Sequence, residues 1–154
     1  MTEAANTRRA PEADDADAEL VARLRLSVMR LARRLRSQAD DGVSASQLSA
    51  LSTLNRCAAL TLGELSAAER VKPPTMTRIV AALEEQGLVT RAVDPTDRRV
   101  ARIALADEGR RLIEANRRRK DAYLAARLAA LDPDDRTAIE RAVAALDALL
   151  EGPA

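Results

Sequence analysis

The chain has 154 residues, enough for one domain with its own core, and its net charge of +1 divides into −4 over residues 1–19 and +5 beyond them. It contains no histidine, Phe or Trp and a single Tyr, so the core must be aliphatic and the commonest acid–base and metal-ligating side chain is missing. No catalytic or phosphate-loop motif occurs and no apolar run could span a membrane, so we expect a cytoplasmic protein, not an enzyme, without metal or cofactor.

The N-terminal part of the chain divides into a tail and a helix. Residues 1–16 are polar, contain a proline and have no hydrophobic period, which predicts a disordered acidic tail. From Leu20 to Leu35 apolar residues recur at steps of three and four, a pattern typical of a helix. A charged pair and Gly42 interrupt this pattern, so we predict one helix over 17–40.

The middle of the chain carries the start signals of three more helices. A Ser or Thr followed three residues later by Gln or Glu has the spacing of a capping box. This spacing occurs twice: Ser44–Gln47 and Thr61–Glu64. A third start is the pair Pro73-Pro74, which suits only the first turn of a helix, and Gly87 fits the C-terminal cap. Residues 61–87 therefore predict a helix, a tight turn and a second helix.

After the fourth predicted helix the hydrophobic period becomes that of a strand. The runs LVTRAV (88–93) and VARIAL (100–105) are rich in Val and Ile, and the Asp-Pro that opens 94–99 starts a turn between them. We therefore predict a hairpin. Two charged helices follow, the first from Asp107 and the second from Asp132, where a cap, a proline and acidic residues coincide.

The order of these elements and three strings of residues resemble the MarR family of transcription regulators. The strings are LGELSAAERVKPPTMTRIVAALEEQGLVTR, DPTDRRVARIALADEGRRL and LDPDDRTAIERAVAALDALL, and the resemblance extends over residues 20–150. It implies a mainly α, α+β winged helix-turn-helix fold with six helices and a two- to three-stranded β-hairpin wing. One departure is Arg70, where many members of the family carry Gly in the turn between the paired helices.

The resemblance also divides the chain by role. It implies a MarR-type domain over 17–151, in which 61–105 is the winged helix-turn-helix, while 17–40 and 107–151 serve mainly dimerisation. A two-fold homodimer would read an inverted repeat in double-stranded DNA. The alternative is a monomer with slack aliphatic helices. Apolar residues left over on the terminal helices fit the dimer: Val21, Leu146, Leu149 and Leu150.

The predicted recognition helix carries side chains that suit DNA at its N-terminal end. Thr75, Thr77 and Arg78 lie there. The acidic Glu84 and Glu85 lie at the far end, away from phosphate. Arg78 can bind guanine or phosphate and the threonines can do either, although an exposed arginine is otherwise an ordinary solvated charge. Two further basic residues are lesser candidates for phosphate contacts: Lys72 and Arg91.

Asp97, Arg98 and Arg99 crowd the tip of the predicted hairpin. In any other loop such a cluster would be a solvated turn. The wing of the MarR family closely resembles it, and the resemblance implies that Arg99 enters the minor groove, where narrow A·T-rich DNA concentrates negative potential. Asp97 would orient an arginine and not touch DNA, because DNA repels a carboxylate.

The resemblance also raises the question of what the protein senses. Members of the family commonly bind small phenolic or other aromatic anions between the dimerisation helices and the DNA-binding lobe, and we expect Met29, Arg30 and Gln47 to line such a site. Other members respond to oxidation of a cysteine. Cys57 follows Leu54 in helical register, so we expect a buried, structural cysteine, with redox sensing as the alternative.

The leading hypothesis is a transcriptional repressor that a small-molecule ligand releases from its operator. A second hypothesis is a DNA-binding protein of the same fold that has no effector. A third is a helical interaction protein of another class, which would not need the arginines of DPTDRR.

Overall fold

The structure, a computed structural model, describes residues 11–38, 42–94 and 100–151, with side chains from residue 17 onward. The chain divides into two compact units, residues 1–38 and 39–154. The predicted wing tip and most of the predicted N-terminal tail lie outside the described residues.

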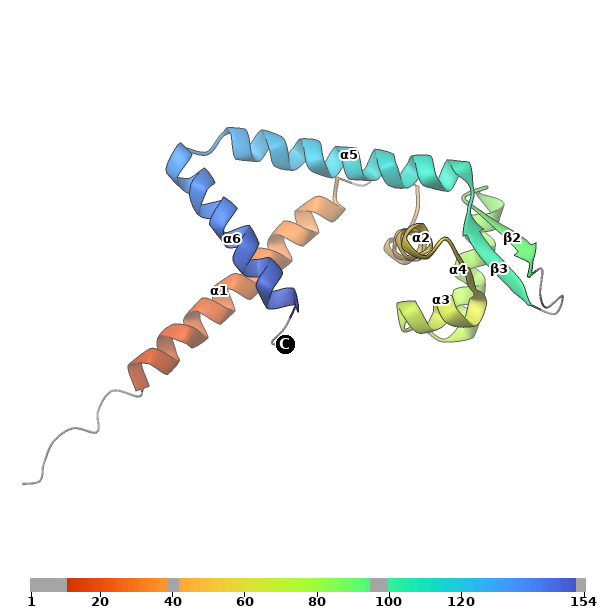
Figure 1. The fold of residues 1–154 in the computed structure, drawn as a ribbon, viewed down its shortest axis with the longest axis horizontal. Coiled ribbons are helices and arrows are strands. Elements are labelled where there is room, and N and C mark those ends of the chain that lie inside the picture. Colours follow the sequence, from red (N-terminus) through yellow and green to blue (C-terminus); the bar gives the residue numbers. More distant parts are fainter. Residues whose placement is uncertain (1–10, 39–41, 95–99, 152–154) are drawn as a thin grey trace, which may run out of the picture. The chain divides into compact units, whose positions relative to one another are not determined.

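In the first unit the described residues form helix α1 (Pro11–Arg36) (Figure 1). The helix begins at Pro11 and not at residue 17 as predicted. Proline suits the first position of a helix, because the N–H that it lacks would have no partner there. The segment predicted as a tail therefore contributes residues 11–16 to the helix, and residues 1–10 lie outside the described residues.

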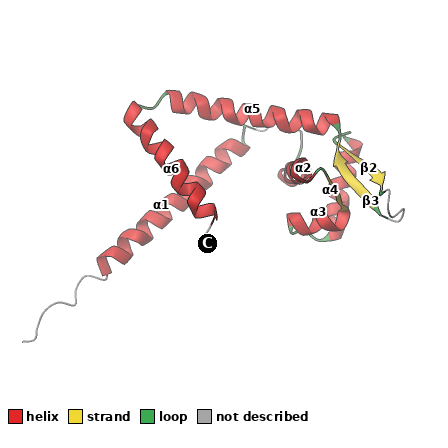
Figure 2. Cartoon of the chain, in the orientation of Figure 1, coloured by secondary structure: helices red, strands yellow, loops and turns green. Residues whose placement is uncertain are grey.

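In the second unit helices predominate over a small sheet, as Figures 1 and 2 show. The described elements follow in chain order: α2 (Ala45–Cys57), β1 (Ala59–Thr61), α3 (Leu62–Glu69), α4 (Pro73–Glu85), β2 (Val89–Val93), β3 (Ala101–Leu105), α5 (Asp107–Ala129) and α6 (Pro133–Glu151). The six helices and the hairpin confirm the predicted winged helix-turn-helix architecture. No helix in the described part of the chain is both long and apolar enough to cross a membrane.

The sheet is antiparallel, with the strand order β1-β3-β2. Strands β2 and β3 form the predicted hairpin, in which Thr90 pairs with Ala104. Strand β1 pairs with the other edge of β3, so that Leu60 lies opposite Ile103. Three residues are too few to show a strand period in the sequence, and the pairing of β1 therefore emerges only from the fold.

The predicted helix caps form as the sequence indicates. The hydroxyl of Ser44 accepts a bond from the amide of Gln47 at 3.2 Å, and the Gln47 side chain accepts from the amide of Ser44 at 2.7 Å. Thr61 and Glu64 make the same reciprocal pair at 3.2 and 2.8 Å. Gly87 follows α4 with a positive φ of 69°, the left-handed conformation that ends a helix at low cost.

The core lies between α2, α3, α4 and the sheet and is aliphatic, as the composition predicts. It fixes one face of α4 and leaves the opposite face outward. The largest fully buried side chains are Leu51, Leu54, Leu65, Met76, Leu83, Ile103 and Val80.

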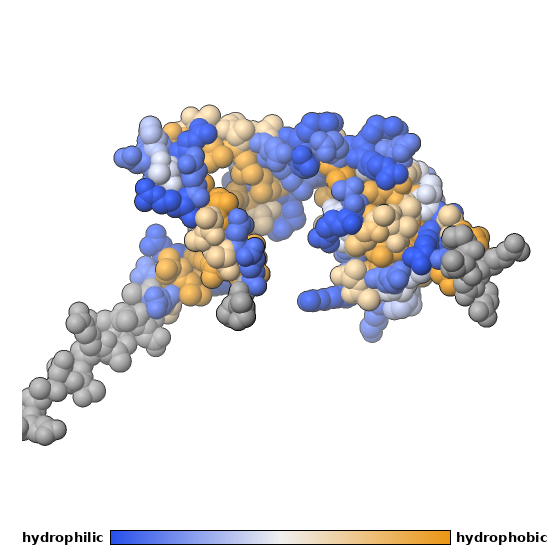
Figure 3. All heavy atoms as spheres, viewed as in Figure 1, coloured by the Kyte–Doolittle hydropathy of each residue, from blue (hydrophilic) through white to orange (hydrophobic). Residues whose placement is uncertain are grey.

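Helix α6 contributes no buried residue to this core. The exposed fractions of Ile139, Val143 and Leu150 are 40%, 51% and 84%, and apolar side chains reach the surface of α6 in Figure 3. These residues recur at helical spacing on one face of α6. An apolar face of this kind normally packs against another part of the protein or against a partner. Val21 on α1 is likewise exposed, by 63%.

Candidate nucleic-acid interface

The turn between α3 and α4 closes through a residue in the left-handed conformation. Arg70, the residue that departs from the family pattern, has φ 53° and ψ 39°. Its amide donates to the carbonyl of Ala67 at 3.1 Å, and the amide of Val71 donates to that of Ser66 at 3.0 Å. An arginine therefore takes the turn that glycine would take at lower cost.

Replacing Arg70 with Gly should raise the free energy of unfolding by about 0.5–1 kcal/mol, because a left-handed L-residue is strained. Ala67→Gly, on the exposed side of the same helix, is the matched control and should lower it by about 1 kcal/mol. Urea denaturation measures both. If Arg70→Gly destabilised the protein as much as the control, the turn would not be strained at this position.

The N-terminus of α4 offers few backbone donors to a ligand. Pro73 and Pro74 occupy its first two positions and have no N–H. The amides of Thr75 and Met76 both donate to the carbonyl of Lys72, at 2.9 and 3.2 Å. The hydrogen-bonding groups that this helix end can offer to a ligand are therefore mainly those of its side chains.

Thr75, Thr77 and Arg78 are exposed on the outward face of α4, as predicted. The Thr77 hydroxyl donates to the carbonyl of Pro73 at 2.9 Å, so its oxygen is left to act as an acceptor. No ion pair engages Arg78 within the part of the chain that the structure describes. Lys72 is also exposed, and its side chain does not cap the helix. The structure thus brings these four predicted residues together at one helix end.

Arg91, the other basic candidate, is engaged within the protein. From β2 its guanidinium donates to both carboxylate oxygens of Glu84 at the end of α4, at 3.2 and 3.0 Å. This hydrogen bonding raises the pKa of Arg91 above its ordinary value. Part of its charge is therefore already compensated within the protein.

A buried carboxylate anchors the base of the wing. Asp94 is only 5% exposed, and its amide donates to the carbonyl of Val100 at 2.8 Å. Arg102 on β3 donates to the carboxylate of Asp94 and lies 3.9 Å from Glu64 of α3. The bond to Asp94 raises the pKa of Arg102, while the Thr61 amide lowers the pKa of Glu64 below its ordinary value of 4.5. These contacts tie the hairpin to the start of α3. The predicted tip residues lie outside the described residues: Asp97, Arg98 and Arg99.

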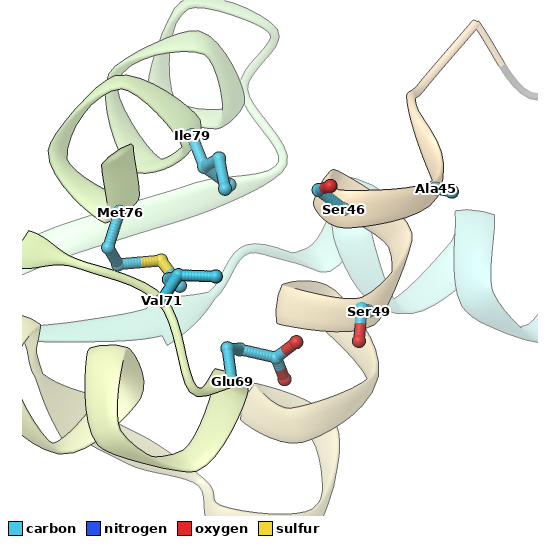
Figure 4. Close-up of a pocket in the computed structure, with 7 residues that line it drawn as sticks. All are labelled: Ala45, Ser46, Ser49, Glu69, Val71, Met76 and Ile79. Carbon is cyan, nitrogen blue, oxygen red and sulfur yellow. The ribbon is translucent and has the colours of Figure 1, made fainter. Parts of the chain in front are cut away.

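The three residues predicted to line a ligand site lie on two different helices. Met29 and Arg30 are exposed on α1, and the side chain of Gln47 is used in the cap of α2. A site formed by these three stays a prediction. Sequence reasoning missed a different cavity, of about 250 Å³, between α2, the end of α3 and α4 (Figure 4).

The expectation that Cys57 is buried is wrong, because its side chain is exposed. Leu54, one turn earlier, is 1% exposed and belongs to the core. Helix α2 ends at Cys57, and Ala58 turns the chain away with a positive φ of 61°. The apolar stripe of the helix therefore stops before it reaches the cysteine.

Replacing Cys57 with Ser should leave the affinity for DNA unchanged, with and without mild peroxide. The chain has a single cysteine, so no second thiol of the same chain can resolve a sulfenic acid. Gel-shift titrations of both proteins measure the effect. Release of the wild type alone by peroxide would make the exposed thiol a redox sensor.

Comparison with known proteins agrees with this geometry. The profile of the MarR family matches residues 43–101, which contain α2 to the start of β3. An uncharacterized HTH-type transcriptional regulator of Mycobacterium bovis is 43% identical over 138 residues, which are 89% of this chain and 96% of that protein.

Two solved structures share the fold closely. A putative transcriptional regulator from Pseudomonas aeruginosa superposes with a TM-score of 0.79 at 33% identity, covering 90% of this chain and 98% of the other. A MarR family protein from Bacillus stearothermophilus gives a TM-score of 0.74 at 29% identity, with the same coverage. The winged helix-turn-helix, the exposed outer face of α4 and these relatives agree, and the chain belongs to the MarR family of DNA-binding, helix-turn-helix transcriptional regulators.

Proposed function

We propose that the protein is a cytoplasmic repressor that binds an inverted-repeat operator in double-stranded DNA as a homodimer and is released by a small molecule. The observation that carries DNA recognition is the outward face of α4, where Thr75, Thr77 and Arg78 are exposed while the opposite face is fixed in the core. A rigidly packed helix can hold side chains at the base edges of the major groove.

The two ends of the interface have different roles in this proposal. Arg78 and Thr75 read bases or phosphates from the major groove, and Lys72 contributes a phosphate contact. Arg99 enters the adjacent minor groove from the wing tip, with Asp97 orienting one of the two arginines. The anchored wing base at Asp94 supports this placement, because it holds the strands that lead into the tip.

Dimerisation through the terminal helices is supported by the apolar stripe of α6 and by the exposed apolar residues of α1, which include Val21. Large aliphatic side chains at such exposure favour burial against a second chain. A two-fold dimer presents two copies of α4, which matches the symmetry of an inverted repeat.

Membership of the family favours a small aromatic or phenolic ligand in contact with Met29, Arg30 and Gln47. The alternatives are an effector-independent binder of the same fold and a redox sensor, for which the exposure of Cys57 is the specific observation.

Operator binding tests the DNA interface, with the DNA upstream of the protein's own gene as the first target. Arg78→Ala should weaken binding by roughly 1–3 kcal/mol, and Arg99→Ala by a similar amount through loss of a minor-groove guanidinium. Arg91→Ala should weaken it less, because Glu84 already engages that guanidinium. Fluorescence anisotropy at physiological salt measures each affinity.

The matched control is Arg141→Ala, which removes the same exposed charge from α6 and should leave operator affinity unchanged. If the Arg78→Ala and Arg99→Ala variants each bound the operator as tightly as this control, the protein would not read DNA through α4 and the wing. An equal loss from Arg91→Ala and Arg78→Ala would instead assign Arg91 a direct contact.

A further inference from the structure

The cavity between α2 and α4 has one apolar and one polar side. Val71, Met76 and Ile79, from the α3–α4 turn and from α4, supply the apolar wall. Ser49 on α2 and Glu69 at the end of α3 supply polar groups, and Figure 4 shows the Glu69 carboxylate extending toward Ser49. A volume of about 250 Å³ admits a ligand of one ring or a short branched chain and little more.

The carboxylate at this cavity accepts a hydrogen bond from a hydroxyl, and that hydroxyl in turn accepts one from the Arg56 guanidinium. Glu69 Oε1 accepts a bond from the Thr53 hydroxyl at 2.6 Å, and the Thr53 oxygen accepts in turn from Arg56 at 3.0 Å. Among the described residues no ion pair includes Glu69. The Thr53 bond holds the carboxylate in place at the cavity, and the Arg56 guanidinium, which binds the same hydroxyl, offsets part of its charge.

We propose that this cavity binds a small organic cation with an apolar body. A protonated amine could donate to Glu69 and to the hydroxyl of Ser49, while its apolar part covers Val71 and Ile79. An anion of the same shape would gain no such bond, because the Glu69 carboxylate accepts hydrogen bonds and has none to donate. The favoured charge is thus opposite to that of a phenolic anion, and the site differs from the one predicted around Met29.

Residues that line the cavity are adjacent in sequence to the proposed DNA-binding residues. Met76 lies between Thr75 and Thr77, and Val71 belongs to the turn that orients α4. An occupant would therefore contact the helix that carries the recognition face. As the site of an effector the cavity rests on the proposed function, whereas as a binding site it does not.

Three probes of nearly equal size separate charge from shape: benzylamine, benzyl alcohol and benzoate. Each is titrated into the DNA-free protein, and backbone amide shifts are followed by NMR. We expect benzylamine to bind with a roughly millimolar Kd, at least about tenfold tighter than benzyl alcohol, and benzoate not to bind. The largest shifts should occur at Ser49, Glu69, Val71 and Ile79.

Glu69→Gln keeps an acceptor for Thr53 and removes the charge, so it should abolish the preference for benzylamine. Glu85→Gln removes a carboxylate from the exposed end of α4, outside the cavity, and should leave the preference intact. A second variant, Ser49→Leu, fills the cavity from an exposed position and should abolish binding of benzylamine.

Equal affinities for benzylamine and benzyl alcohol, shifts outside the cavity, or an unchanged preference in Glu69→Gln would overturn the inference. Operator binding is measured separately on the same protein. If the protein binds its operator but not benzylamine, this inference alone is wrong. If it binds benzylamine but no operator, the proposed function alone is wrong.

Discussion

Replacing Gly109 with Ala should destabilise the protein by about 3 kcal/mol and lower its Tm by roughly 10 °C. A Cβ at this position would lie 2.1 Å from the carbonyl oxygen of Leu88 and 3.2 Å from Leu105 Cδ2. The same Leu88 carbonyl accepts the amide of Ala106 at 3.1 Å, just before α5 begins. The start of α5 is thus docked directly on backbone that leads into β2, and backbone cannot yield as a side-chain tip can.

Gly63→Ala is the matched control for this substitution. It adds the same methyl group to α3, where the nearest atom, Thr61 Oγ1, is 4.0 Å away. Because alanine is the better helix former, the control should be neutral or stabilise the protein by up to about 1 kcal/mol. Urea denaturation measures both variants. If the two variants had the same free energy of unfolding, α5 could move away from Leu88 without loss of stability.

Much of the fold is predictable because its signals are local. The caps at Ser44 and Thr61 and the glycine at position 87 depend on residues three or four positions apart, and each forms as the spacing indicates. The outward face of α4 follows from the helical period around Met76. The exposure of Thr75 and Arg78 is therefore predictable from the sequence.

The parts that sequence reasoning misses depend on tertiary contacts or on the exact end of an element. Cys57 has the periodicity of a core residue, but α2 ends there and its side chain is exposed. Arg91 looks like a free cation until the hairpin places it against Glu84, seven residues away in sequence. The cavity at Glu69 arises from three segments, none of which carries a motif for a ligand.

Substitutions in the apolar stripe of α6 should have a large effect on dimerisation. Replacing Ile139 and Val143 together with Glu should convert the proposed dimer to monomers, raising its dissociation constant by more than about a hundredfold. Burial of each such side chain is worth about 1.5–3 kcal/mol, and two-fold symmetry counts each substitution twice. Neither side chain is part of the core of the single chain, so the monomer itself should stay folded.

The control for the interface is Ala144→Glu with Ala148→Glu, which places the same pair of charges one turn apart on the opposite side of α6. Both alanines are exposed, and a helical step of about 100° per residue directs them away from the stripe. Light scattering across a concentration series should give a dimer for wild type and control and a monomer for Ile139→Glu with Val143→Glu. Because an inverted repeat needs two recognition helices, the monomer should also lose most of its operator affinity. A dimeric Ile139→Glu, Val143→Glu protein would place the dimer interface elsewhere on the chain, and the apolar face of α6 would then need a different partner.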